Sequence, residues 1–187
     1  MRQINLLVIH SSATKENQSF TLQALETSHR KRGFNGIGYH YYIRQSGEVI
    51  NTRPLSRIGA HAKGHNRNSI GICYEGGLDK DGKSKDTRTP EQRTSLRQLV
   101  NELLMRFPGS KVCGHRDLSP DLNRNGKIEP HEWTKQCPCF DVASELWNLV
   151  KPPWTLKFHT ENLSASKLSV GDTCEGTLAT FLESASP

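Results

Sequence analysis

The chain has 187 residues, of which 34% are hydrophobic and 24% charged, and a formal net charge of +6. This length suits one domain with a buried core, and the composition excludes a disordered chain. The longest clean apolar run, residues 6–9, excludes a membrane span and is too short for a secretory signal, so we expect synthesis in the cytoplasm without a signal peptide.

The first half of the chain alternates between strand and helix patterns. Residues 3–10 form an apolar run without helical period, which predicts a central strand. Residues 21–32 predict a helix, because their basic last turn complements the helix dipole and a glycine follows. Residues 39–44 and 48–53 predict the two arms of a hairpin, and residues 69–75 predict another strand.

The second half continues the alternation. A charged loop over residues 79–88 leads to Thr89, which is expected to cap a helix with Gln92 as its capping-box partner. That helix stops before residue 107, and residues 111–114 predict a short strand. Asp141 is expected to cap a last helix that ends near residue 150.

These patterns predict one α/β domain over residues 1–150, with a central mixed β-sheet flanked by helices. After a Lys-Pro-Pro step at residues 151–153, the composition shifts toward Ser and Thr without a convincing period. Residues 151–187 are therefore expected to form a poorly structured C-terminal tail.

Two histidines and a cysteine pair indicate a metal site. His10 and His115 each follow a predicted strand, and residues at the ends of strands can converge on one point. Zinc in catalytic sites typically takes three nitrogen, sulfur or oxygen ligands from the protein. The third ligand is Cys137 or Cys139, and spacing alone does not decide between them or exclude two structural thiols. Pro138 restricts Cys137 to an extended conformation, which would help to aim its sulfur. The five cysteines are odd in number and irregularly spaced, which argues against a disulfide framework.

Six short segments carry a more specific signal together than any one of them does alone. They are Val-Ile-His-Ser-Ser (8–12), Gly-Tyr-His-Tyr (38–41), Gly-Ala-His-Ala-Lys-Gly-His-Asn (59–66), Asn-Ser-Ile-Gly-Ile (68–72), Gly-His-Arg-Asp (114–117) and Lys-Gln-Cys-Pro (135–138). In this order they resemble the motifs of zinc-dependent N-acetylmuramoyl-L-alanine amidases, a family that includes short phage lysozymes and peptidoglycan recognition proteins. The resemblance extends from the first strand to the helix near residue 150.

The resemblance implies a reaction and its residues. It makes His10, His115 and Cys137 the zinc ligands, and it makes Tyr39 and Lys135 the catalytic residues. The implied activity is hydrolysis of the amide bond between N-acetylmuramic acid and L-alanine in peptidoglycan. In this reading Lys135 and zinc stabilise the oxyanion, and Tyr39 orients the water or assists proton transfer to the leaving amine.

The Gly-rich segment over residues 59–66 predicts a loop that lines a cleft. By resemblance, its His61 and Asn66 either contact the substrate or hold the loop, and the two roles are equally open. His40 is not assigned to catalysis, because it would point away from Tyr39 in a strand.

A second metal pattern lies between two of the predicted zinc ligands. Residues 121–132 fit the calcium-loop template D-x-[DN]-x-[DN]-G-x₅-E without a mismatch. Its predicted oxygen donors are Asp121, Asn123, Asn125, the carbonyl of Lys127, Glu129 and Glu132. An Asn-Gly turn that needs no ion is the alternative. Short phage relatives have a closer histidine and cysteine, so residues 119–133 are predicted to be an insertion, and calcium there would make it rigid.

Peptidoglycan or its muropeptide fragments are the expected partner. The positive charge suits an acidic polymer, although it is equally compatible with simple solubility, and nucleic acid is not favoured because no arginine-rich run is interleaved with aromatics. The main alternative function is a non-catalytic peptidoglycan-binding module, which the complete set of ligands argues against. Some short phage members also bind host RNA polymerase, so a regulatory protein partner is a third interpretation. We expect a monomer that acts on the cell wall, either in phage lysis or in bacterial recycling.

Overall fold

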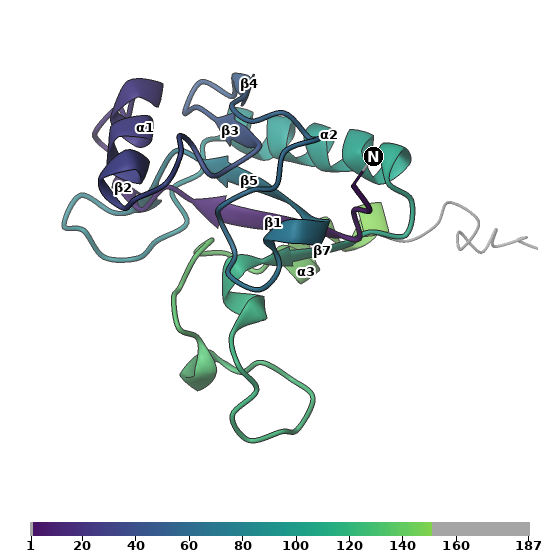
Figure 1. The fold of residues 1–187 in the computed structure, drawn as a ribbon. Helices are drawn as coiled ribbons and strands as arrows, with labels where there is room; N and C mark the ends of the chain where they lie inside the picture. Colours follow the sequence, from purple (N-terminus) through teal and green to yellow (C-terminus); the bar gives the residue numbers. More distant parts are fainter. Residues whose placement is uncertain (1, 151–187) are drawn as a thin grey trace, which may run out of the picture. The chain divides into compact units, whose positions relative to one another are not determined.

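The computed structural model describes residues 2–150, with side chains up to residue 146. The predicted tail, residues 151–187, lies outside the described residues. A five-stranded sheet forms the centre of the domain, in the order β4-β3-β5-β1-β7 (Figure 1). Its strands are β1 (Leu6–Ser11), β3 (Tyr41–Ile43), β4 (Val49–Asn51), β5 (Ser69–Tyr74) and β7 (Lys111–Gly114). All neighbours pair in parallel except β3 and β4, which are antiparallel, so the predicted mixed sheet is confirmed.

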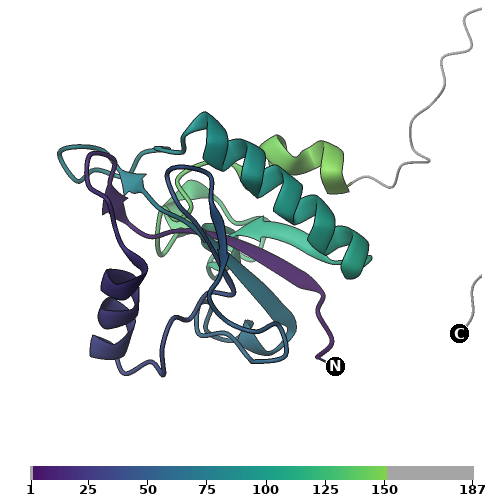
Figure 2. The same cartoon turned by 90° about the horizontal axis from the view of Figure 1, so that it is seen from above.

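Within residues 2–150, three α-helices flank the sheet: α1 (Leu22–Lys31), α2 (Pro90–Arg106) and α3 (Val142–Val150). Seen from above, α2 and α3 lie next to each other on one side and α1 lies apart from them (Figure 2). The predicted caps are present. Thr89 and Gln92 form a capping box, and Asp141 accepts a hydrogen bond of 2.8 Å from the backbone N–H of Ser144. Such caps satisfy N–H groups that a helix start leaves free.

The alternation of side chains along the strands divides the sheet into two unlike faces. Leu7 and Ile9 of β1, together with Ile70 and Ile72 of β5, pack against apolar residues of α2 and α3 to form the main core. Side chains at the intervening positions point to the opposite face. His10 is one of these, so the pleat alone directs it away from the main core.

A smaller apolar cluster lies on the opposite face. Leu25 of α1 packs there with Tyr42 and Cys73, and Tyr39 and Phe20 pack against the cluster. This cluster is smaller than the main core, and the same face also carries His10. A cleft lined by His10, Leu25 and Tyr39 opens on this face.

The structure contains several short elements that the sequence did not predict. Strands β2 (Thr14–Lys15) and β6 (Gly77–Leu78) pair as a separate two-stranded sheet. Three 3₁₀ turns also occur, η1 (Asn66–Asn68), η2 (His115–Leu118) and η3 (Pro130–Glu132). The predicted hairpin is present, but its paired arms have only three residues each, and β4 lies at the edge of the sheet, where short strands are common.

The charged loop before α2 contains a buried cation that the sequence pattern did not reveal. The Arg88 side chain has no exposed surface and forms ion pairs with Asp86 at 2.9 Å and Glu145 at 2.6 Å. Its guanidinium carbon also lies 3.2 Å from the centre of the Phe140 ring. Arg88 therefore ties this loop to α3 and to the segment that follows Cys137.

The predicted insertion, residues 119–133, extends from the sheet at the lower side of Figure 1. It leaves from η2 just after β7, contains η3, and returns the chain toward Cys137. Among the described residues, no helix is long and apolar enough to span a membrane.

Candidate metal centre and cleft

His10 and His115 meet because their strands are neighbours in the sheet. Ile9 of β1 is in register with Gly114 of β7, so the next residue on each strand lies at the same edge. The two imidazole rings have centroids 4.6 Å apart. The prediction that two strand-end histidines converge is therefore confirmed in its geometry.

Cys137 reaches the same point from the far end of the insertion. Its Sγ lies 3.8 Å from Nδ1 of His10 and accepts a hydrogen bond of 3.3 Å from the backbone N–H of Ser11. The next residue, Pro138, packs on Gly114, where an added Cβ would lie 2.6 Å from the proline Cδ. A glycine before His115 therefore allows the cysteine segment to approach closely. One potential ligand atom from each of His10, His115 and Cys137 lies within 4.8 Å of the others.

Cys139 does not join this group. Its Sγ donates a hydrogen bond of 3.3 Å to the carbonyl of Gly77 and lies 3.9 Å from the hydroxyl of Ser11. It is thus directed toward the small two-stranded sheet. These positions favour Cys137 over Cys139 as the third ligand, and the ligand assignment itself stays a prediction.

The three side chains form a donor set that suits zinc. Zinc accepts imidazole nitrogen and thiolate sulfur, and catalytic sites leave a position open beside three protein ligands. Burial, followed by the nearby charges of His61, His115 and Lys135, lowers the pKa of His10 well below its usual value. Burial and the charge of Lys135 also lower the pKa of His115. Both imidazoles therefore favour the neutral form that binds metals.

The environment of Cys137 works in the opposite direction. Burial raises the pKa of its thiol to about 11, although hydrogen bonds with Ser11 lower it in part. A thiolate in this position needs a cation beside it, and a metal ion bound here would supply one.

The two residues predicted to be catalytic lie at the same cleft. The Tyr39 ring is centred 5.1 Å from that of His10, and its backbone follows Gly38, whose N–H donates 2.9 Å to Nδ1 of His29. Burial raises the pKa of Tyr39 well above its usual value, so the phenol keeps its proton at neutral pH. Lys135 is exposed and its charge acts on both histidines.

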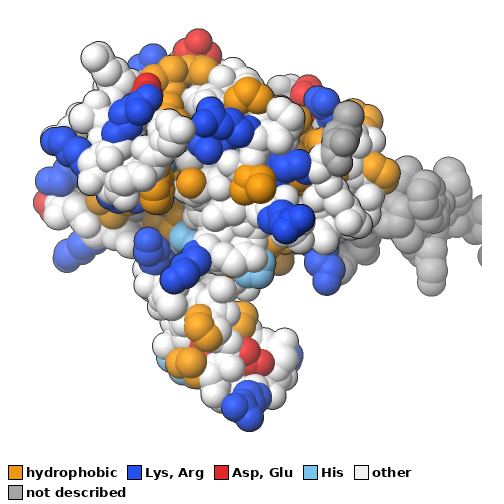
Figure 3. All heavy atoms as spheres, viewed as in Figure 1, with side chains coloured by type: hydrophobic (Ala, Val, Ile, Leu, Met, Phe, Trp, Pro, Cys, Tyr) orange, Lys and Arg blue, Asp and Glu red, His pale blue; other side chains and the backbone are white. Residues whose placement is uncertain are grey.

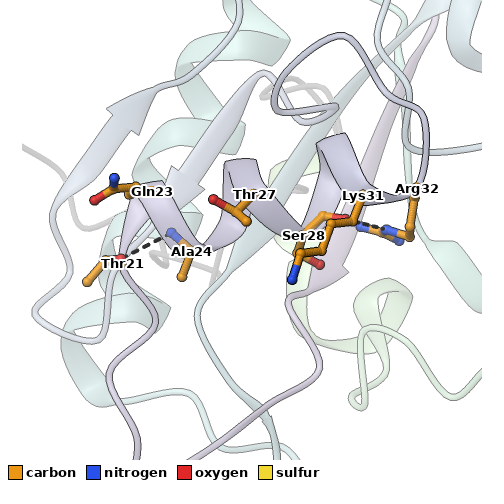
Figure 4. A pocket seen from close by; sticks show the side chains of 7 residues that line it. All are labelled: Thr21, Gln23, Ala24, Thr27, Ser28, Lys31 and Arg32. Carbon is orange, nitrogen blue, oxygen red and sulfur yellow. Dashed lines mark hydrogen bonds between the residues drawn. The ribbon is translucent and has the colours of Figure 1, made fainter.

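These residues line one cleft of about 700 Å³. Its walls come from the end of β1, α1, the loop over residues 59–66, and the segment that carries Lys135 and Cys137. Lys and Arg side chains are spread over the face in Figure 3, and Asp and Glu are few there. A second hollow follows α1 and shares Ser28 and Arg32 with the cleft (Figure 4). It contains hydroxyl and basic side chains but none of the residues predicted to bind the metal.

The loop over residues 59–66 is held by the side chains for which two roles were open. Asn66 accepts hydrogen bonds of 2.9 Å from the backbone N–H groups of both His61 and Ala62. Nδ1 of His61 lies 3.1 Å from Nε2 of His10. Both residues also line the cleft, so their contacts are of the holding kind while substrate contact stays a prediction. His40, which was not assigned to catalysis, is buried and accepts 3.0 Å from the N–H of Gly71.

In the predicted calcium loop, the carboxylates accept hydrogen bonds from the loop's own backbone and side-chain amides. The Asp121 carboxylate accepts from the N–H groups of Asn125 at 3.2 Å and Gly126 at 2.8 Å. Glu132 accepts from the N–H of Asn123 at 3.2 Å, and Glu129 accepts from the side-chain amides of Asn123 and Asn125 at 3.0 and 3.2 Å. Gly126 has a φ of +80°, as the sharp turn of the template requires. Calcium binding here stays a prediction.

The fold and the cleft define an α/β domain with a cluster of two histidines and a cysteine at the carboxyl edge of its parallel strands. A model of the N-acetylmuramoyl-L-alanine amidase family matches residues 1–138. The chain therefore belongs to this family.

Individual relatives agree with that assignment. The endolysin of Enterobacteria phage T3 is 37% identical over 136 residues, which cover 73% of this chain and 81% of the endolysin. The endolysin of Escherichia phage T7 is 35% identical over 136 residues, with the same coverage of each chain. The solved structure of the N-acetylmuramoyl-L-alanine amidase LysC from Clostridium intestinale has a TM-score of 0.61 and 28% identity, over 79% of this chain and 85% of LysC.

Proposed function

We propose that the chain is a zinc-dependent hydrolase that cuts the amide bond between N-acetylmuramic acid and L-alanine in peptidoglycan. The observation that carries the proposal is the meeting of His10, His115 and Cys137 within one cleft that also contains Tyr39 and Lys135. Family membership supports the class of reaction, and the donor set supports the choice of zinc. A module that only binds peptidoglycan has no need of all five residues.

His10, His115 and Cys137 would hold the zinc ion, which would supply a Lewis acid and lower the pKa of a bound water to about 7. The remaining residues act on the substrate. Lys135 carries a positive charge on the rim of the cleft, where it stabilises the negative charge that develops on the carbonyl oxygen. Because Tyr39 keeps its phenolic proton, it can donate a hydrogen bond that orients the attacking group or assists proton transfer to the leaving amine.

The cleft also suits a polymer substrate. It is open, about 700 Å³ in volume, and basic side chains such as Arg32, Lys63 and Lys135 line it. The peptide stems of peptidoglycan carry carboxylates, which these cations attract. We propose that the chain acts on the cell wall, in lysis or in turnover of wall fragments.

Digestion of purified peptidoglycan by the zinc-loaded protein tests the proposal. Mass spectrometry is expected to find free stem peptides that begin with L-alanine, together with glycan strands that keep intact reducing ends. The matched control is Lys135→Ala, which leaves the three ligands in place. New reducing sugar ends without free stem peptides would reject the amidase proposal. Binding to peptidoglycan without any release would favour the non-catalytic module instead.

A further inference from the structure

We propose that His61 is a positioning residue that fixes the tautomer and ring orientation of His10, so that Nδ1 of His10 presents its lone pair to the metal. This inference rests on the proposed function, because it assigns a partner to one of the proposed zinc ligands. The resemblance to amidase motifs predicts only that His61 contacts the substrate or holds its loop.

The first argument is the direction of the two ring nitrogens of His10. Nδ1 faces Cys137, whose Sγ lies 3.8 Å away, so this nitrogen is on the metal side. Nε2 faces the other way and lies 3.1 Å from Nδ1 of His61. The two rings are nearly perpendicular, at 85°, which allows an N–H of one to point into the plane of the other. His10 is only 1% exposed, so water does not compete for this contact.

Proton positions follow from the requirement that Nδ1 of His10 be free for the metal. A neutral imidazole carries one proton, so Nε2 of His10 must carry it and donate to Nδ1 of His61. His61 then carries its own proton on Nε2, which lies 3.3 Å from the hydroxyl oxygen of Ser69. Ser69 is fully buried and accepts this bond. The two histidines and the serine thus form one directed chain of hydrogen bonds that begins at the metal ligand.

The second argument is that the backbone is shaped around the His61 ring. A Cβ added to Gly71 would lie 2.5 Å from Cγ of His61, and one added to Gly59 would lie 2.5 Å from its Cδ2. Real side chains do not approach so closely, so both neighbours must be glycine if the ring is to lie there. Gly71 is in the central strand β5, where a glycine otherwise weakens the strand.

The third argument is that the loop is anchored on both sides of the ring. Asn66 accepts hydrogen bonds from the N–H groups of His61 and Ala62, at 2.9 Å each. The backbone of His61 is therefore fixed independently of any ligand in the cleft. An outer partner held in this way reduces the freedom of the metal ligand, and such partners typically change metal affinity by about 10–100-fold.

A matched pair of variants separates the hydrogen bond from the packing of the ring. His61→Asn retains an acceptor at the position of Nδ1. In His61→Leu, the leucine side chain has nearly the same shape as asparagine but offers no acceptor. Both leave the same space beside Gly59 and Gly71, so they lose the same packing. Zinc affinity is measured by competition with a chromophoric chelator, and the thermal stability of the metal-free forms is measured alongside.

We expect His61→Leu to bind zinc about 10–100-fold more weakly than wild type, and His61→Asn to recover most of that loss. The metal-free melting temperatures show whether both variants fold, so that zinc affinity is compared between folded proteins. Equal zinc affinities for the two variants would overturn the proposal. If neither wild type nor His10→Ala binds zinc, the proposed function fails instead. This outcome is distinct from equal zinc affinities in the two His61 variants, which would overturn only the role of His61.

A spectroscopic measurement keeps the proposal testable if either variant does not fold. Long-range ¹H–¹⁵N correlation spectra of metal-free wild type at neutral pH report the tautomer of each histidine. The proposal requires the Nε2–H form of both His10 and His61. An Nδ1–H form of His10 would refute it, whatever the variants do.

Discussion

Replacement of Cys137 by serine, with Cys139→Ser as its matched control, tests which thiol completes the metal centre. Only Cys137 lies with the two histidines, its Sγ 3.8 Å from Nδ1 of His10, whereas Cys139 is bonded to Gly77. Both changes substitute oxygen for sulfur, at two positions of the same segment that are two residues apart. They should therefore differ in metal binding rather than in general folding.

The expected size of the effect follows from the ligand positions. Loss of an outer partner costs about 10–100-fold in metal affinity, so loss of a direct thiolate ligand should cost at least about 100-fold. Zinc at 100 times the dissociation constant stabilises the folded protein by about 2.7 kcal/mol, which raises the melting temperature of a domain of this size by about 5–10 °C. At the same zinc concentration, Cys137→Ser would retain only about 0.4 kcal/mol, or about 1–2 °C.

Differential scanning calorimetry with and without zinc measures these shifts directly. We expect the full shift for wild type and Cys139→Ser, and almost none for Cys137→Ser. A full shift in Cys137→Ser, with loss of the shift in Cys139→Ser, would refute the assignment of the ligand. Loss of the shift in both variants would mean that the segment, rather than one sulfur, governs binding.

Three further predictions concern the rim, the insertion and the buried ion pairs. Lys135→Ala should lower kcat about 10²–10³-fold at unchanged zinc content, measured by release of amino groups from peptidoglycan; loss of zinc as well would contradict a role confined to the substrate. Calcium should raise the melting temperature of zinc-loaded wild type but not of Glu132→Gln, and an unchanged wild-type midpoint would exclude the calcium site. Burial alone would raise the pKa of Asp86, but hydrogen bonds and charge from Arg88 outweigh it and lower that pKa. The stabilisation from Asp86 should therefore be complete above its unfolded pKa of about 3.9 and decline as the pH falls further, and urea unfolding of wild type and Asp86→Asn from pH 7 to 2.5 should show their difference shrinking. A constant difference would count against this reasoning.

Local signals in the sequence predicted most of the elements. The apolar run before His10, the capping box of Thr89 and Gln92, and the cap at Asp141 each depend on neighbours within a few residues. Such signals act through backbone hydrogen bonds and side-chain periodicity, so they can be recognised without the fold. The order of six motifs also predicted the family, which the match over residues 1–138 confirms.

Contacts between distant segments could not be predicted in this way. The burial of Arg88 depends on its ion pair with Glu145, which is 57 residues away. The pattern of charges along the sequence does not distinguish Glu145 from an ordinary exposed glutamate. The two-stranded sheet of β2 and β6 is equally non-local, and each of its strands has only two residues to reveal it. A short strand carries too little periodic signal to be recognised from sequence.

The candidate metal centre shows both kinds of information. The sequence alone showed that His10 and His115 each follow a strand, because the apolar pattern of each strand ends just before its histidine. The register that aligns Ile9 with Gly114, the approach of Pro138 to Gly114, and the contact between His10 and His61 were decided only by tertiary structure. Their physical reason is the same: each depends on which strands are neighbours and on how closely two backbones approach, and no spacing along one chain encodes either distance.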